Sequence, residues 1–467
     1  MFSALITIGM ILGCNKEPAY TPVSQSDTRI YEFWLEKTES NPNLKRAYPG
    51  MIVGDSAIRL MVDYGTDITA LEPTIISGSD SIFPKGKQNF TSPVNYTLWA
   101  NGKAVTYTVR ITVSTVQNPV IKSVASGFAH IIAIKTDGTV WACGSNSSGQ
   151  LGLGDYSNRN KLTQVPVYNA EQAFTGDAAT IIKLKDGSAW GVGNEYGQLG
   201  LGNKNPIARL TRVPYFDNVT QIAITFGEVF VVKPDGTVWG AGRNWEKILA
   251  QPDADLHASF VKVPIENVKS ISGNGLEIIV QKNNGEIWGW GKNNAGQLGL
   301  SDNLPHATPV KIASLSNKIA KVFAGASVFL IDSSGTVWAS GPNLNAQLGL
   351  GDQTNRNVFT QVSFFDNKPI ETIVSRFGAT SFMEKNGTVW NVGSNSTGLM
   401  GQGNLSTLPY LTPVQLPNFT ASTIAGFGNA AFALSTDGTL WGWGNNSGGV
   451  LGTGTAIVNL SSPTQLK

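Results

Sequence analysis

Few side chains of this sequence are suited to nucleophilic or metal chemistry. Its 467 residues include only two cysteines and three histidines, and the formal net charge is +2. The histidines His130, His257 and His306 have no metal-ligand spacing, whereas zinc sites draw on clusters of histidine, cysteine and carboxylate. We therefore expect neither a metal ion nor another cofactor.

Two glutamates in matching places are the candidates for acid–base chemistry. Glu228 and Glu277 each lie eight residues before a turn glycine, and His130 occupies the same place earlier in the chain. A carboxylate pair serves as general acid and base when its surroundings separate the two pKa values. No nucleophile or metal set accompanies the pair, so we favour hydrogen-bonded carboxylates without a catalytic role. A lyase or hydrolase reaction at these three residues is the alternative.

A third candidate is the segment Trp245-Glu246-Lys247, which offers an aromatic ring and both charges. It replaces glycine-rich sequence that stands at the matching places elsewhere. Loops on a rigid scaffold often carry recognition, and Trp is a favoured binding residue. The segment is therefore either a binding loop or a repeat that has lost its pattern, and the second interpretation is the simpler one.

The elements that position these residues recur about every fifty residues. Seven tryptophans are spaced 49, 49, 49, 50, 52 and 51 residues apart, namely Trp141, Trp190, Trp239, Trp288, Trp338, Trp390 and Trp441. A turn pair such as Asp137-Gly138 precedes each one, and such pairs join antiparallel strands because they reach positive φ cheaply. A glycine-rich loop such as Gly149-Gln150-Leu151-Gly152 follows most of them. Seven copies of a several-stranded unit indicate a β-propeller.

The repeated tryptophans are in phase on their strands, which is typical of core packing rather than of a sugar-stacking surface. Trp290 and Trp443 lie two residues after a repeat tryptophan, and Cys143 has the same offset from Trp141. We expect Cys143 to be a small buried hydrophobe.

The repeat resembles that of the regulator of chromosome condensation family, in which Gly-Thr-Val-Trp is followed by Gly, Asn and Gly-Gln-Leu-Gly-Leu-Gly. The resemblance implies a seven-bladed propeller over residues 118–467. The best-known activity of that family, guanine-nucleotide exchange on a small GTPase, is implied there by an inserted wedge. No repeat spacing here exceeds 52 residues, so we do not expect that activity.

The two ends of the repeat region suggest how the ring closes. The first copy starts at Val120 without a clear preceding strand, and the chain ends on the strand-like segment Ser462-Pro463-Thr464-Gln465-Leu466. We expect this last strand to complete the blade begun at Val120, since closure removes exposed strand edges.

Residues 28–117 are predicted to form a small β-sandwich. Val94–Trp99 and Val105–Val113 alternate polar and apolar residues, and Asn101-Gly102 between them is a type I′ hairpin signal. The block from Phe90 to Val109 resembles the immunoglobulin-like modules of bacterial cell-surface lipoproteins, which act mainly as spacers or adhesive units.

The first fourteen residues are predicted to be a lipoprotein signal peptide. An apolar run from Phe2 to Leu12 is too short to span a bilayer, and Ile11-Leu12-Gly13-Cys14 resembles the bacterial lipoprotein signal box. The resemblance implies lipid attachment at Cys14, with residues 15–27 as a linker. Acyl chains would then anchor the exported protein to the cell envelope, at the outer membrane or cell surface.

These features together favour a binding protein over an enzyme. The balanced charge gives no reason to bind nucleic acid. We expect a lipid-anchored, all-β, non-catalytic protein whose propeller is a protein-interaction scaffold. Glycan binding through exposed loop aromatics, led by Trp245, is the alternative.

Overall fold

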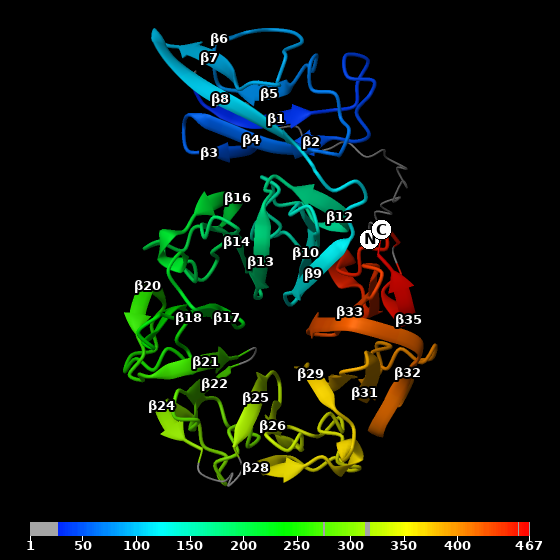
Figure 1. The fold of residues 1–467 in the computed structure, drawn as a ribbon. Coiled ribbons are helices and arrows are strands. Elements are labelled where there is room, and N and C mark those ends of the chain that lie inside the picture. Colours follow the sequence, from blue (N-terminus) through cyan, green and yellow to red (C-terminus); the bar gives the residue numbers. More distant parts are fainter. Residues whose placement is uncertain (1–26, 274–275, 313–317, 456, 467) are drawn as a thin grey trace, which may run out of the picture. The chain divides into compact units, whose positions relative to one another are not determined.

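The computed structural model describes residues 27–273, 276–312, 318–455 and 457–466. These residues form two compact units, a small β-sandwich and a ring of β-sheets (Figure 1). Helical structure within them is limited to three single turns, η1 (Pro214–Phe216), η2 (Ser363–Phe365) and η3 (Ser447–Gly449). No helix in the described part of the chain is long and apolar enough to cross a membrane. The predicted signal peptide, with Cys14, and nearly all of the predicted linker lie outside the described residues.

The N-terminal unit pairs a three-stranded sheet with a five-stranded sheet. The first has the order β2 (Tyr48–Pro49), β1 (Ile30–Leu35), β5 (Thr74–Ser77), and the second has the order β3 (Met51–Val53), β4 (Ala57–Val62), β8 (Lys103–Val113), β7 (Val94–Ala100), β6 (Ser81–Phe83). Phe33 of β1 packs edge to face on Tyr96 of β7, and both rings are buried. The core of the unit therefore lies between its two sheets.

The predicted hairpin between β7 and β8 is confirmed. Ala100 pairs with Lys103, and Asn101 and Gly102 have φ of 50° and 72°. Positive φ at both central residues is the requirement of a type I′ turn.

The second unit is the predicted seven-bladed propeller (Figure 1). Blade 1 comprises β9 (Ile121–Ser126), β10 (His130–Lys135), β11 (Val140–Gly144) and β12 (Arg159–Val165), and blade 2 comprises β13 (Ala170–Thr175), β14 (Ala179–Leu184), β15 (Ala189–Gly193) and β16 (Ile207–Arg212). Blade 3 comprises β17 (Gln221–Ile224), β18 (Glu228–Val232), β19 (Val238–Gly242) and β20 (His257–Lys262), and blade 4 comprises β21 (Val268–Ser272), β22 (Glu277–Lys282), β23 (Ile287–Gly291) and β24 (His306–Lys311). Blade 5 comprises β25 (Ile319–Ala324), β26 (Val328–Asp332), β27 (Val337–Gly341) and β28 (Arg356–Gln361). Blades 6 and 7 comprise β29 (Ile370–Ser375), β30 (Ala379–Glu384), β31 (Thr388–Asn395), β32 (Ser406–Phe427), β33 (Ala430–Ser435), β34 (Leu440–Asn445) and β35 (Asn459–Gln465). The first strand of each blade is innermost in the ring (Figure 1).

The prediction of ring closure by the C-terminal strand is wrong. β35 pairs with β34, with Trp441 opposite Gln465, and so completes blade 7. Blade 1 already has four strands of its own, because β12 follows β11 in sequence and pairs with it. The single long strand β32 ends blade 6 and begins blade 7, so each blade is one uninterrupted stretch of chain.

One buried asparagine shapes the loop that follows the third strand of every blade. Its Oδ1 accepts the backbone N–H five residues on, and its Nδ2 donates to the carbonyl nine residues on. These residues are Asn146, Asn194, Asn244, Asn293, Asn343, Asn395 and Asn446. The asparagine of the sequence motif is therefore a structural residue.

The same loops join neighbouring blades. At six of the seven, the N–H eight residues after the asparagine donates to the outer strand of the next blade, as Gly154 does to Ala208 at 2.9 Å. Gly454 of blade 7 donates to Asn160 of blade 1 at 2.8 Å, so the ring closes with the same bond. Blade 3 has Pro252 at this place, and proline has no N–H to donate.

Candidate functional site

The turn between the first and second strands and the loop after the third strand lie at the same end of each blade. In blade 3 the first residue of β18, Glu228, pairs with the last residue of β19, Gly242, which in turn pairs with His257 at the start of β20. We call this end of the ring the loop face, and the opposite end, with the Asp-Gly turns, the turn face. Both predicted candidate sites in the described residues, the set of Glu228, Glu277 and His130 and the Trp245 segment, lie near the loop face.

The loop of blade 3 keeps the geometry of the other loops although its sequence differs. Asn244 accepts from the Leu249 N–H at 2.9 Å and donates to the Asp253 carbonyl at 2.6 Å. Lys247 and Ala250 both have φ of 54°, at places where most other blades have glycine. Because left-handed backbone is costly for residues with a side chain, this loop is held in shape by its surroundings.

Trp245 is the most exposed aromatic residue of this loop face, at 69% of its surface. Its ring lies beside Arg243, whose guanidinium carbon is 4.8 Å from the Trp245 ring centroid and 3.8 Å from that of Tyr196. Arg243 thus contacts one aromatic ring from blade 3 and one from blade 2. Such contacts are favourable cation–π interactions, and they hold the guanidinium in place.

Glu228 and Asp177 lie near this arginine, and Glu195 lies near Asp177. Glu228 Oε1 is 3.9 Å from Arg243 Nε. Burial raises the pKa of Asp177, while Arg243 lowers it and Glu195 raises it further, so both charges are near Asp177. Glu195 also accepts a 2.5 Å hydrogen bond from Ser148 Oγ of blade 1. We call Asp177, Glu195, Tyr196, Glu228, Arg243 and Trp245 the Arg243 cluster.

The cluster combines an open aromatic surface with planar charged groups that are fixed in orientation. The Arg243 side chain is only 13% exposed, and that of Glu228 is 3% exposed. Glu228 accepts bonds from the Thr225 hydroxyl and the Gly227 N–H, which oppose the rise in its pKa that burial causes. This arrangement can hold a polar ligand through hydrogen bonds and stack its apolar face on Trp245.

Four phenylalanines meet at the centre of the loop face. Phe128, Phe226, Phe377 and Phe427 come from the turns of blades 1, 3, 6 and 7, and every pair of their ring centroids lies between 5.4 and 6.3 Å apart. Phe427 is buried, whereas Phe128 and Phe377 are 41% and 45% exposed. We call this group the four-phenylalanine cluster, and it closes this end of the ring axis with apolar surface.

The three predicted channel residues are not brought together as a catalytic set. Glu277 is fully buried, and burial raises its pKa to about 8. Hydrogen bonds from the Leu276 N–H and the Gln297 side chain partly oppose this rise. Neither glutamate is among the main influences on the other's pKa. Each carboxylate is bound within its own turn or by its own loop.

His130 is buried between blades 1 and 2. Its Nε2 lies 3.0 Å from Thr180 Oγ1, and that hydroxyl donates to the Gln150 carbonyl. The hydroxyl proton is thus committed, so Nε2 carries the imidazole proton and donates. Burial lowers the pKa of His130 to about 3, which keeps it neutral.

The repeat tryptophans are half-buried to buried on the third strands. Four of them donate their indole N–H to the side chain two residues earlier, as Trp141 does to Thr139 at 3.2 Å. Trp290 and Trp443 are fully buried, and both donate to loop carbonyls of the preceding blade. Cys143 is also buried. None of these side chains offers an open stacking surface.

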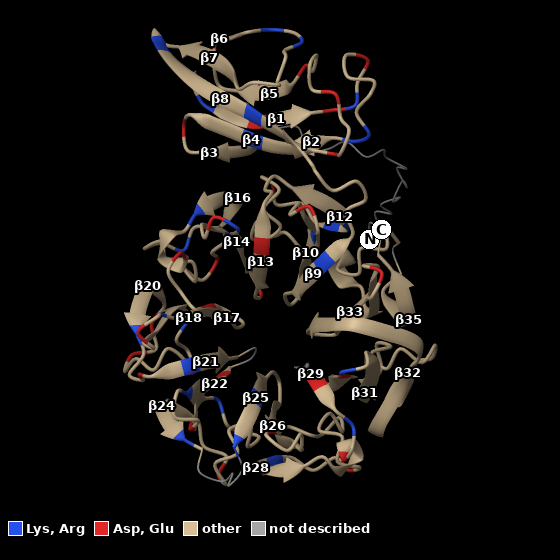
Figure 2. Cartoon of the chain, in the orientation of Figure 1, with Lys and Arg blue, Asp and Glu red and all other residues tan. Residues whose placement is uncertain are grey.

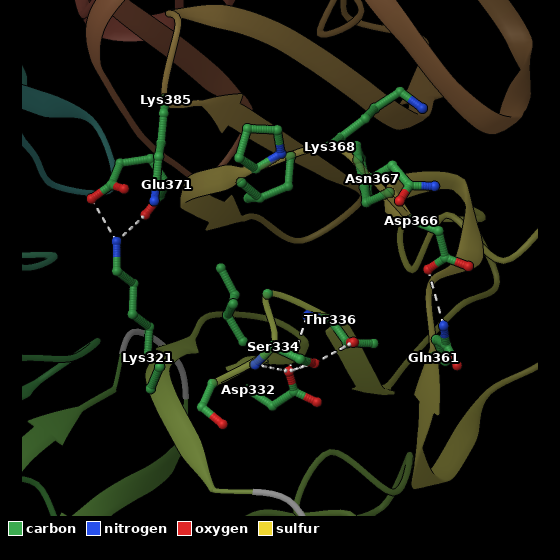
Figure 3. Close-up of a pocket in the computed structure, with 17 residues that line it drawn as sticks. Lys321, Asp332, Ser334, Thr336, Gln361, Asp366, Asn367, Lys368, Glu371 and Lys385 are labelled. Atoms are coloured by element: carbon green, nitrogen blue, oxygen red, sulfur yellow. Dashed lines mark hydrogen bonds and ion pairs between the residues drawn. The ribbon is translucent and has the colours of Figure 1, made fainter.

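A groove of about 860 Å³ lies at the turn face between blades 5 and 6 (Figure 3). Lys321 Nζ binds the Glu371 carboxylate at 2.5 Å and its carbonyl at 3.0 Å. Asp332 accepts from Ser334 Oγ and from the Thr336 N–H. The charged groups of the groove are therefore largely bound to neighbouring groups. Around the ring as a whole, both signs of charge are mixed (Figure 2).

Sequence reasoning found Trp245 and Glu228 but missed their partners. Asp177, Tyr196 and Arg243 carry no repeating pattern, so only the packing of blade 2 on blade 3 identifies them. The four-phenylalanine cluster did leave a signal. Phe128, Phe226 and Phe377 all stand two residues before the recurring position of His130 and Glu228.

Comparisons with known proteins agree with this architecture. Regulator of chromosome condensation (RCC1) repeats match residues 137–181 and 284–330, and a second RCC1 repeat family matches residues 121–150. The ring thus contains RCC1 repeats. The N-terminal domain of SGBP, surface glycan-binding protein, matches residues 43–111 and fits the N-terminal unit.

Two solved structures resemble the ring. Yeast RCC1 (Prp20), bound to Kap60, is 16% identical, with a TM-score of 0.62 over 74% of this chain and 85% of that one. Human WBSCR16 is 19% identical, with a TM-score of 0.58 over 69% of this chain and 87% of that one. At these identities the likeness establishes the fold, an RCC1-type propeller.

Proposed function

We propose that this protein is a bacterial surface glycan-binding protein whose propeller holds the glycan at the Arg243 cluster. The observation that carries the proposal is the exposed Trp245 ring beside the fixed guanidinium of Arg243. A sugar ring has an apolar C–H face and a rim of hydroxyls. Aromatic side chains and precisely placed polar groups suit these two features.

The carboxylates support a ligand rich in hydroxyl groups. Asp177 and Glu195 offer acceptor oxygens close to the donor groups of Arg243, so the site has both donors and acceptors for hydroxyls, whereas Glu228 is too deeply buried to contact a ligand. The SGBP domain in the N-terminal unit supports the same function and a place at the cell surface. Glycan binding is therefore favoured here over the protein-interaction scaffold that was the first expectation from the sequence.

A glycan array with the whole protein tests this proposal. The unchanged protein should bind certain glycans on the array, and Trp245→Ala should not bind them. Leu344→Ala is the matched control, because Leu344 follows the buried Asn343 just as Trp245 follows Asn244 and is 68% exposed. Equal binding by the unchanged protein and Trp245→Ala would rule this site out.

The four-phenylalanine cluster supports protein binding as a second candidate function. Exposed apolar side chains also lie on separate loops of the same face, including Tyr156, Leu304, Leu344, Leu405, Ile457 and Val458. Apolar surface collected on one face of a soluble protein is typical of an interaction site. Pull-down from an envelope fraction with the unchanged protein and with Phe128→Ser/Phe377→Ser tests this candidate. Identical captured proteins would count against it.

Lipid anchoring at Cys14 is part of the proposal. Acylation would hold the protein at the membrane surface while the propeller meets its ligand. Metabolic labelling with a fatty acid should mark the unchanged protein and not Cys14→Ala. Labelling that survives this substitution would contradict the anchor.

A further inference from the structure

Arg376 is a buried arginine with no counter-ion. It lies at the end of the first strand of blade 6, is 2% exposed, and its Nη2 donates to Ser381 Oγ at 2.7 Å. Its Nε and Nη1 have no hydrogen-bond partner among the described residues. Ser381 in turn donates to Asn391 Oδ1 at 2.5 Å, so the surrounding network is neutral.

This arrangement is costly for the protein alone. A buried charge without a partner is among the most unfavourable features of a protein interior. No carboxylate forms an ion pair with Arg376 in the described part of the chain, and burial is the one influence on its pKa, which it lowers to about 10. The guanidinium therefore remains a cation at neutral pH and requires compensation from outside the chain.

A cavity suited to an anion lies on the ring axis beside Arg376. It has a volume of about 270 Å³ and is lined by inner strands of blades 1, 4, 5, 6 and 7, including Ser272, Ser375 and Gly426. A Cβ built on Gly426 would lie 2.8 Å from Arg376 Nη1. Only the glycine backbone thus separates this part of the guanidinium from the cavity wall.

The cavity hydroxyls are set up as donors. Ser272 Oγ accepts the Ala324 N–H at 2.9 Å, and Ser375 Oγ accepts the Ser327 N–H at 3.1 Å. Neither hydroxyl donates to another described group. Because each oxygen already accepts a backbone N–H, each O–H is available to donate, which is the polarity that an anion needs.

Apolar surface covers the end of this cavity. Phe377 directly follows Arg376, and Phe427 directly follows Gly426. Both belong to the four-phenylalanine cluster, so they lie at the loop-face end of the strands that line the cavity.

We propose that the propeller binds a small inorganic anion, of the size and charge of chloride, on its axis at the hydroxyls of Ser272 and Ser375, with the Arg376 guanidinium across Gly426 from it. The anion compensates the buried guanidinium and stabilises the junction of blades 6 and 7. This site is separate from the Arg243 cluster and independent of its proposed function.

Thermal unfolding in chloride and in gluconate, at constant ionic strength, tests the proposal. Gluconate is the bulky control anion. The unchanged protein should melt higher in chloride, and Arg376→Met should lose this dependence, with a chloride Kd raised about thirtyfold or more, as for the loss of one partner of a buried charge pair. Arg159→Met is the matched control, because Arg159 forms a partly exposed pair with Asp155. The same response to chloride in the unchanged protein and in Arg376→Met would overturn the proposal.

A second measurement needs no variant. Crystals of the whole protein grown in bromide should show an anomalous peak within hydrogen-bond distance of Ser272 Oγ or Ser375 Oγ. A channel without such a peak would refute the site, even if Arg376→Met fails to fold.

Discussion

Glu277→Gln should change how stability depends on pH, because the carboxyl of Glu277 is held neutral by burial. Its pKa is raised from 4.5 to about 8 in the folded protein. Between these values the native protein holds a proton that the unfolded chain has released. The free energy of unfolding therefore falls as pH rises, by about 1.36 kcal/mol per pH unit.

The expected size follows from this slope. Between pH 5 and pH 8 the free energy of unfolding of the unchanged protein falls by about 4 kcal/mol because of Glu277. Glu277→Gln has no proton to release and should not show this fall. With an unfolding entropy of about 2.1 cal/mol/K per residue over roughly 350 propeller residues, this corresponds to about 5 °C in Tm.

Thermal unfolding of both proteins at pH 5, 6, 7 and 8 measures the effect. The Tm of Glu277→Gln minus the Tm of the unchanged protein should increase steadily as pH rises. Glu246→Gln, which changes an exposed glutamate, is the control and should run parallel to the unchanged protein. If Glu277→Gln also runs parallel from pH 5 to pH 8, the assignment of a buried neutral carboxyl is refuted.

Four further predictions follow from buried or strained residues. The pKa of His130 is lowered to about 3, so the stabilisation by the neutral imidazole is lost as pH falls below 6.5. In His130→Gln the free energy of unfolding should therefore change less with pH, by about 1.36 kcal/mol per pH unit between pH 6 and pH 4. An unchanged slope in acid unfolding would contradict this. Asn343→Ala should lower the free energy of unfolding by about 2–4 kcal/mol, because two buried hydrogen bonds of 2.9 Å are lost; denaturant unfolding beside the exposed-site variant Asn294→Ala measures it. Lys247→Gly and Ala250→Gly should each raise stability by about 0.5–1 kcal/mol, since they remove left-handed strain; a loss of stability would show that the loop is not strained. In a Cys14→Ser background, Cys143 should resist maleimide until the protein unfolds, because burial raises the pKa of its thiol; rapid labelling of the native protein would contradict its burial.

The period of the repeat fixed the number of blades, but it could not fix their phase. Trp141 and the Asp137-Gly138 pair mark the second and third strands of a blade in the sequence, as the structure confirms. The boundary between blades leaves no such mark, because β32 runs from blade 6 into blade 7 without a turn. The repeat spacing alone therefore predicts the wrong blade for the C-terminal strand.

The candidate sites show a similar limit. Trp245 departs from a repeat and so is visible in the sequence, whereas Tyr196 and Arg243 meet only because blade 2 packs on blade 3. Arg376 gives no sequence signal at all, since arginine is ordinarily exposed. Its burial depends on the small residue Gly426 in the next blade, a pairing that repeat spacing does not specify.

The central claim is that the propeller, rather than the N-terminal unit, binds the glycan. Each unit exposes one large tryptophan surface, Trp245 at 69% in the propeller and Trp99 at 40% in the sandwich. Isothermal titration of a glycan from the array should give a Kd about thirtyfold weaker for Trp245→Ala, the loss typical of a hot-spot tryptophan, and an unchanged Kd for Trp99→Ala. Binding that is lost in Trp99→Ala and kept in Trp245→Ala would contradict the claim.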